Sequence, residues 1–345
     1  MSEAVLRELL DKARADGVIG RASLSVWVDG TRQCLVATDG GDGAYDIASV
    51  TKAVTAVAAL QHVAPDERVH GVQGRPTVSA LLSHTSGLPA WRPLFAHAAI
   101  ELGVDVSTLV RTPSLHEKAR AIYRRIVADT LADAARPTYS DLGFFALGEW
   151  LSERTGRPIR GLQASILPNA PRGHATGRER PRPGNPDFET DVVGRSGHDP
   201  SATDHAVDDD NAAAVGGACG HAGLFAEADA VASFWDRLRR DADDGTGGLL
   251  PPGIARELFT PIAAGRTLGL DTPTGASPAI GTILGRGPLG AAGHLGFTGC
   301  SLWIDRDRRL SVALLTDAVR LARPSPGIRL LRPAIHDALA RLLGA

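Results

Sequence analysis

Residues 45–60 read YDIASVTKAVTAVAAL, and this stretch carries the first sign of chemistry in the chain. Its apolar spacing predicts a helix that begins near Ser49, which places Ser49 and Lys52 on one face, one turn apart. Lys52 would be an ammonium, or a neutral amine if burial lowers its pKa, and a neighbouring lysine can remove the proton of a serine hydroxyl. Backbone N–H groups at a helix start can also stabilise an oxyanion. The alternative is an N-cap serine followed by a solvated lysine, so this motif alone is a weak signal.

A second candidate is Tyr139-Ser140-Asp141, in RPTYSDLGFFALGEWL (136–151). Tyr139 lies between a proline-containing turn and a predicted helix, where a loop can present a phenol to a pocket. A tyrosine near a lysine can have its pKa lowered and act as a general base. The alternative is a tyrosine packed at a helix start, with Ser140 or Asp141 as the N-cap.

A third candidate is the glycine-rich stretch GHLGFTG (293–299), just before the predicted strand CSLWID. Its glycines would let a strand edge approach a substrate closely. His294 could orient or polarise a substrate group near neutral pH. The alternative is a glycine-rich loop with a surface histidine.

The order and spacing of these three stretches resemble the serine β-lactamase and penicillin-binding-protein superfamily. The closer resemblance is to its class C β-lactamase-related branch, which also holds DD-peptidases, esterases and transesterases. LLSHTSGLP (81–89) is similar to the LLTHTSGLP segment of that branch, and GHAGLF (220–225) is similar to its GHAGLF segment. TLGLDTP (267–273) also fits, so the resemblance spans most of the chain.

The resemblance implies a role for each matching residue. Ser49 would be the acylated nucleophile, and Lys52 and Tyr139 would form the proton-transfer pair. The backbone N–H groups of Ser49 and Phe297 would form the oxyanion hole. We expect no cofactor and no metal.

Departures from the family pattern bear on the substrate. His294-Leu295-Gly296 stands where lactamases have KTG, and a histidine with a reference pKa of about 6.5 is largely neutral at pH 7. Leu295 lacks the hydroxyl that could hold a substrate carboxylate, and Asp141 replaces the asparagine of YxN, so it can only accept hydrogen bonds when ionised. These changes weaken the case for a β-lactam or a D-Ala-D-Ala terminus. If His294 must be neutral, activity should rise through about pH 6–7; if it must be charged, activity should fall there.

The strand patterns lie at the two ends of the chain. ASLSVWV (22–28) and TRQCLVAT (31–38) flank Asp29-Gly30 and predict a hairpin. A similar pair, 300–305 and 309–316, flanks a charged turn. We therefore expect one α/β domain built from both chain ends.

The implied fold is α/β (α+β) and β-lactamase/DD-peptidase-like: an antiparallel sheet flanked by helices, with an inserted, mostly helical domain. We expect the α/β domain over 1–60 and 226–345, and the inserted domain over 61–225 with a long loop at 169–210. That loop is either a surface excursion or a lid over a pocket. Helices are expected at the N-terminus, with Val5, Leu6, Leu9 and Leu10 on one face, and over residues 50–63, 78–83, 115–134, 142–153 and 328–343.

The composition of the chain limits the classes of partner and the kinds of cross-link that we expect. The 345 residues carry a net charge of −2, so nothing suggests a nucleic-acid or anionic-membrane partner. Three cysteines are too few for a disulfide framework, and no zinc-type spacing appears. The sequence shows no signal-peptide pattern and no apolar run of the roughly 18 residues needed for a membrane span, so a cytoplasmic protein is expected. The oligomeric state is left open.

The expected function is a serine hydrolase that cleaves an ester or amide of a small molecule through a Ser49 acyl-enzyme. The first alternative is an acyltransferase or transesterase, which would use the same acyl-enzyme with an alcohol or amine in place of water. The second is a true β-lactamase or DD-peptidase. The third is a non-catalytic binding protein that has kept the fold.

Overall fold

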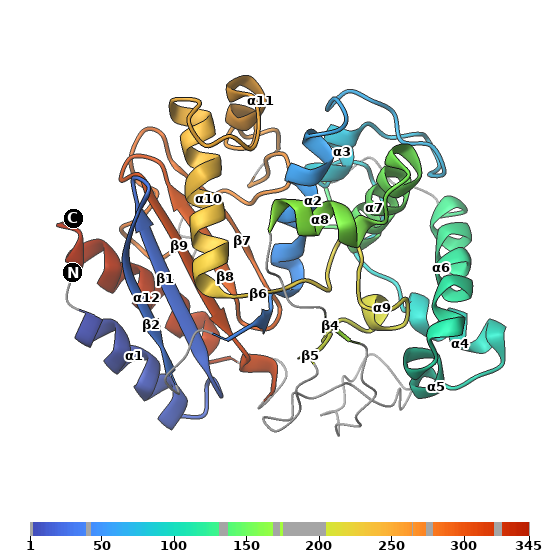
Figure 1. Ribbon diagram of the computed structural model, residues 1–345, viewed down its shortest axis with the longest axis horizontal. Coiled ribbons are helices and arrows are strands. Elements are labelled where there is room, and N and C mark those ends of the chain that lie inside the picture. The colour runs from blue at the N-terminus through green and yellow to red at the C-terminus, as the bar shows by residue number, and fades with distance from the viewer. Residues whose placement is uncertain are drawn as a thin grey trace.

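The computed structural model describes residues 3–38, 43–130, 137–167, 173–174, 205–263, 265–273, 279–320 and 326–344. One antiparallel sheet of five strands has the order β2-β1-β9-β8-β7. The first two strands therefore join the last three through the pairing of β1 with β9, although more than 250 residues separate the two groups (Figure 1). The strands are β1 Ala22–Val28, β2 Thr31–Ala37, β7 Ala291–Leu295, β8 Ser301–Asp305 and β9 Leu310–Thr316.

The two predicted hairpins are present. Asp29 and Gly30 both have positive φ, 48° and 82°, which matches the right-handed twist of a tight β1–β2 turn. β1 also pairs along its whole length with β9, from Ala22↔Thr316 to Val28↔Leu310. Every residue of β9 is buried, because helices cover both faces of the sheet.

Helices α1 (Glu3–Ala15) and α12 (Ile328–Leu342) pack on one face of the sheet, and α10 (Ala228–Asp243) crosses the other (Figure 1). The buried face of α1 is formed by Leu6, Leu10 and Ala13. The expected inclusion of Val5 in that face is wrong, since Val5 is 44% exposed. Residues spaced four and three apart share one helix face, whereas Val5 precedes Leu6 by only one position.

The helices between residues 51 and 213 lie beside the sheet, on the side of β7, whereas α11 (Pro252–Glu257) packs against α10 (Figure 1). Helix α2 is central among them, and all ten of its residues are buried. Three of the helices predicted in this part correspond to α2, α3 and α7. The fourth, predicted over 115–134, corresponds to α6, and its residues 131–134 lie outside the described residues. The helices are α2 Thr51–Leu60, α3 Val78–Leu82, α4 Leu94–Leu102, α5 Val106–Arg111, α6 Pro113–Ala128, α7 Asp141–Thr155, α8 Ile159–Ile166, α9 Asp210–Ala213 and α11 Pro252–Glu257.

Short elements join these parts. β3 (Tyr45–Asp46) pairs with β6 (Phe225–Ala226), and β4 (Gly173–His174) pairs in parallel with β5 (His205–Ala206). Single 3₁₀ turns lie at η2 (Ala48–Val50) and η3 (Ala318–Arg320). Most of the predicted 169–210 loop lies outside the described residues, and the domain boundaries at 61 and 225 remain a prediction.

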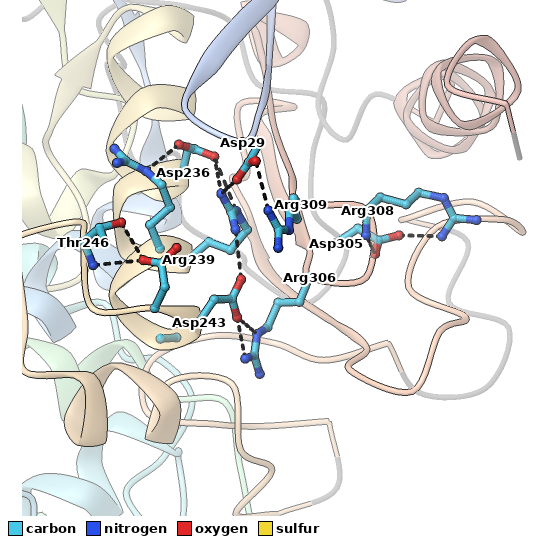
Figure 2. Close-up of polar contacts among 12 residues, drawn as sticks. Asp29, Asp236, Arg239, Asp243, Thr246, Asp305, Arg306, Arg308 and Arg309 are labelled. Carbon is cyan, nitrogen blue, oxygen red and sulfur yellow. Dashed lines mark hydrogen bonds and ion pairs between the residues drawn. The ribbon is translucent and has the colours of Figure 1, made fainter.

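A buried arginine joins α10 to the turns of the sheet. The Arg239 side chain is 1% exposed and contacts Asp236, Asp243 and Asp29, the last of which lies in the β1–β2 turn (Figure 2). Asp243 also binds Arg306, in the β8–β9 turn, at 2.6 Å. Together these contacts fix one end of α10 against both hairpins.

None of the helices within the described ranges is long and apolar enough to cross a membrane.

Candidate active site

Ser49 lies in the 3₁₀ turn directly before α2, between β3 and that helix. The carboxylate of Asp46 accepts a hydrogen bond from the Ala48 N–H at 2.8 Å and closes the turn. Ala48 has φ of +46°, a conformation that costs a non-glycine residue about 1–2 kcal/mol. Such strain persists only where the surroundings enforce it, and it commonly marks functional sites. Ser49 itself is half-buried.

Lys52 is completely buried and joins two candidate residues. Its Nζ lies 2.8 Å from Ser49 Oγ and 2.7 Å from Asp141 Oδ1, and it also donates to the His221 carbonyl at 3.3 Å. Burial alone lowers the pKa of Lys52, but the charges and hydrogen bonds of Asp141 and Tyr139 outweigh burial and raise it. Of the two charge states left open by the sequence, the structure favours the ammonium.

Tyr139 stands between the cations of the site. Lys52 Nζ lies 4.8 Å from the centroid of its ring, and the Arg266 guanidinium carbon lies 5.2 Å from it. The rings of His84 and His294 lie 4.5 and 6.1 Å away. The three separate sequence stretches that carry Ser49, Tyr139 and His294 thus meet in one place.

The LLSHTSGLP segment positions Tyr139. The His84 carbonyl accepts a hydrogen bond from the Thr138 N–H, and His84 Nδ1 accepts one from the Ser140 N–H at 3.0 Å. Burial, together with the charge of Lys52, lowers the pKa of His84 to about 2, so the ring stays a neutral acceptor. Ser140 is the N-cap of α7, as the alternative interpretation of this stretch expected. Ser140 can therefore cap α7 while the neighbouring Tyr139 faces the site, so the two interpretations of this stretch are compatible.

Asp141 has a neighbour that the sequence did not indicate. We expected it to contact substrate, whereas the structure pairs its carboxylate with Lys52. Its backbone N–H donates to the Ala90 carbonyl at 2.8 Å, which fixes the start of α7. A contact between Asp141 and substrate remains a prediction.

His294 lies in β7, is 2% exposed, and has a defined tautomer. Its Nδ1 lies 2.8 Å from the Leu295 carbonyl oxygen, so Nδ1 carries the hydrogen and Nε2 is an acceptor. Nε2 is buried and has no hydrogen-bond partner in the described part of the chain. Burial first, then the charges of Lys52 and Arg266, lower the pKa of His294 to about 3. The expected titration near pH 6–7 is therefore wrong, because it used the pKa of a solvated histidine.

Arg266 is a site residue that the sequence analysis missed. Its guanidinium lies over the Tyr139 ring and forms an ion pair with Asp271. Asp271 in turn pairs through its backbone with Gly293 of β7. The only signal was its place directly before TLGLDTP, since an arginine in an arginine-rich chain attracts no attention.

The turn after β7 lies against the segment that precedes Ser49. A Cβ on Gly296 would stand 2.7 Å from the Ile47 carbonyl oxygen, so this close approach requires glycine. The Thr298 hydroxyl donates to the Asp46 carbonyl at 2.7 Å. Phe297 lies between Gly296 and Thr298 in this turn and is 59% exposed. The geometry therefore brings the two predicted oxyanion-hole residues onto adjoining segments.

The GHAGLF segment wraps α2. The Gly220 carbonyl accepts a hydrogen bond from Thr55, and the Leu224 N–H donates to Thr51. The segment therefore holds the helix that carries Lys52.

A separate cavity, with a volume of about 1260 Å³, lies among α6, α7 and α8. Its lining includes Arg120, Glu149 and Trp150 but none of the predicted site residues. Among the described residues, no group of three or more histidine, cysteine, aspartate or glutamate side chains could hold a metal ion.

The sequence model of the family described as Beta-lactamase matches residues 6–332. The chain belongs to the β-lactamase family. This confirms the resemblance and the fold expected from the motifs, and members of the family are serine hydrolases. No curated protein matches the chain.

Solved structures share the fold at low identity. EstCE1, described as a hydrolase with promiscuous acyltransferase activity, is 20% identical with a TM-score of 0.66, and the match covers 97% of each chain. A β-lactamase from Mycobacterium bovis is 18% identical with a TM-score of 0.60, over 97% of this chain and 100% of the other. A D-stereospecific amidohydrolase from Streptomyces sp. is 20% identical with a TM-score of 0.58, over 92% and 94%.

Proposed function

We propose that this protein hydrolyses esters or amides of small molecules through an acyl-enzyme on Ser49. The observation that carries the proposal is the position of Lys52, whose Nζ contacts both Ser49 Oγ and the carboxylate of Asp141. A nucleophile (Ser49), a proton carrier (Lys52) and a further proton acceptor (Asp141) thus form a chain in which each group lies within hydrogen-bonding distance of the next.

The proton path follows from these contacts. Because Lys52 rests as an ammonium, it can accept the Ser49 proton only if it releases another one. Asp141 Oδ1, at 2.7 Å, is positioned to take that proton. Ser49 Oγ then attacks the carbonyl carbon, and the N–H groups of Ser49 and Phe297 stabilise the oxyanion.

Collapse of the tetrahedral intermediate breaks the bond to the leaving group, which takes up the relayed proton. Tyr139 lies beside Lys52 and is placed to deliver it. Water then attacks the acyl-enzyme by the same steps in reverse order and regenerates Ser49.

The side of the site at His294 favours an uncharged substrate. The neutral ring offers only an acceptor, Nε2, and Leu295 offers no hydroxyl. The positive charge of Arg266 is compensated by Asp271. We therefore propose that the substrate carries no carboxylate on this side of the site.

An acyltransferase is the second candidate. It would need the same acyl-enzyme and an alcohol or amine acceptor in place of water. The support comes from EstCE1, which is described as having promiscuous acyltransferase activity. Product ratios that change when alcohols or amines are added would favour this candidate over simple hydrolysis.

Hydrolysis of p-nitrophenyl butyrate by wild type and Ser49→Ala tests the proposal. We expect kcat/KM of the variant to fall by about 10³-fold or more, because the acyl-enzyme cannot form. Ser165→Ala is the matched control, since Ser165 is an exposed serine on α8. Equal rates in wild type and Ser49→Ala would overturn the proposal.

A further inference from the structure

Arg332, on α12, is a buried arginine whose donors point at backbone carbonyls. It is 8% exposed. Its Nη2 donates to the carbonyls of Gly296 and Cys300 at 2.8 and 2.7 Å, and its Nε donates to that of Gly299 at 3.0 Å. One side chain therefore holds three carbonyls of the turn that follows β7.

Burying the Arg332 guanidinium without a carboxylate partner costs free energy of desolvation. No carboxylate within the described ranges lies at ion-pair distance from Arg332, and burial lowers the pKa of the guanidinium to about 10. A buried cation without a counter-charge is retained only where its hydrogen bonds repay the loss of hydration. Here those bonds all go to one five-residue segment, 296–300.

The peptide plane links Arg332 to the oxyanion hole. The Gly296 carbonyl and the Phe297 N–H belong to the same planar peptide unit, and in a trans peptide they point in opposite directions. A donor fixed on the Gly296 oxygen therefore fixes the direction of the Phe297 N–H. It also polarises the peptide, which makes the N–H a stronger donor.

The other side of the turn is held as well. The Thr298 hydroxyl donates to the Asp46 carbonyl, and the Thr298 carbonyl accepts from the Thr316 hydroxyl at 2.9 Å. Asp46 also closes the turn that presents Ser49. The two oxyanion donors are thus fixed relative to each other through Arg332 on one side and Thr298 on the other.

We propose that Arg332 is a positioning residue that orients and polarises the Gly296–Phe297 peptide, so that its N–H meets the oxyanion formed on the Ser49 acyl carbon. This inference rests on the proposed function. Arg332 contacts neither substrate nor Ser49, and its effect passes through the peptide.

The test compares Arg332→Met and Arg332→Lys with wild type, with active sites counted by titration with a phosphonate that labels Ser49. We expect Arg332→Met to lower kcat per active site about 10- to 100-fold while KM changes less than about threefold, because the oxyanion forms only on the way to the transition state. The affinity for a boronic acid, which forms a tetrahedral adduct with the serine, should fall by the same factor. Arg332→Lys should lose less than Arg332→Met.

Arg239→Met is the matched control, because it also removes a buried arginine but touches only carboxylates far along the chain from the turn. It should lower the melting temperature and leave kcat per active site unchanged. Arg332 variants with wild-type kcat per active site and wild-type boronate affinity would overturn the inference. If Ser49→Ala keeps wild-type turnover, the proposed function has failed instead. Should Arg332→Met not fold, Arg332→Lys carries the same comparison.

Discussion

At the scale of single residues, the charge of Lys52 decides how the site can work. Burial favours a neutral amine, but Asp141 and Tyr139 reverse that preference. The sequence placed Lys52 beside Ser49 because helical periodicity fixes residues three apart. It could not place Asp141 beside Lys52, because that contact depends on how α7 packs against α2.

Asp141→Asn tests the proton relay. Without the carboxylate, Lys52 must lose a proton to solvent before it can accept one from Ser49, and its pKa falls because only Tyr139 still opposes the effect of burial. We expect ester hydrolysis at pH 7 to drop about 10²- to 10⁴-fold and then to rise with pH. Asp129→Asn, at an exposed carboxylate, is the control. A pH–rate profile of Asp141→Asn identical to that of wild type would contradict the relay.

His294→Lys tests the preference for uncharged substrates. A lysine there supplies a cation that can bind a carboxylate, and a charge-assisted hydrogen bond is worth about 1.5–3 kcal/mol. Relative kcat/KM for a carboxylate-bearing ester over its neutral counterpart should therefore rise about 10- to 100-fold. His294→Gln keeps the position neutral and should show no such change. Between about pH 5 and 8 the pH–rate profile of the wild type should show no change caused by titration of His294, since the pKa of His294 is about 3.

At the scale of elements, most of the sheet could be predicted from local signals. Asp29-Gly30 between two β-rich runs indicated the first hairpin, and the structure contains it. The sequence predicted that strands from both chain ends share one domain, but it did not predict that β1 pairs with β9. No local pattern specifies which distant strands pair. Helix α10 was not singled out, although it packs across β1, β9 and β8 on one face of the sheet.

The contact between α10 and the hairpin turns gives a stability prediction. Arg239→Met removes one arginine partner of the buried Asp236 but leaves its ion pair with Arg240, so it should destabilise the protein by about 1.5–3 kcal/mol. Urea unfolding followed by circular dichroism measures this. A loss below about 1 kcal/mol would show that the network does not hold α10 in place.

At the scale of the whole molecule, the site lies where segments from the entire length of the chain meet. Ser49, Tyr139, Asp141, Arg266 and His294 come from five separate elements or loops. Once the family resemblance was recognised, the motif order predicted that all of them except Arg266 belong to one site. Charge and protonation could not be predicted in that way, because they depend on burial, which only the packed structure determines.

Buried histidines predict the pH dependence of stability. The pKa values of His84, His294 and His336 fall from about 6.5 to about 2, 3 and 4, mainly through burial. Below about pH 6.5 the unfolded chain binds protons that the folded chain does not. As the pH is lowered, the free energy of unfolding therefore decreases by about 1.4 kcal/mol per pH unit for each histidine. The loss from His336 should end near pH 4, and the losses from His294 and His84 should continue to about pH 3 and pH 2.

Melting temperatures between pH 7 and pH 4 check this prediction. His336 lies outside the site, with Nδ1 2.9 Å from the Ala279 carbonyl, so His336→Gln should reduce the slope without loss of activity per active site. A melting temperature that stays constant over this range would contradict the burial of neutral histidines.

The central claim is that Ser49 is acylated, and intact-protein mass spectrometry tests it most directly. Wild type and Ser49→Ala are mixed separately with p-nitrophenyl butyrate, a cephalosporin and a D-Ala-D-Ala peptide, and quenched early. We predict that wild type gains the mass of one butyryl group from the ester, while Ser49→Ala gains none. A butyryl adduct of equal yield on Ser49→Ala would contradict the account, and an adduct on wild type from the cephalosporin or the peptide alone would move the substrate to antibiotic or cell-wall chemistry.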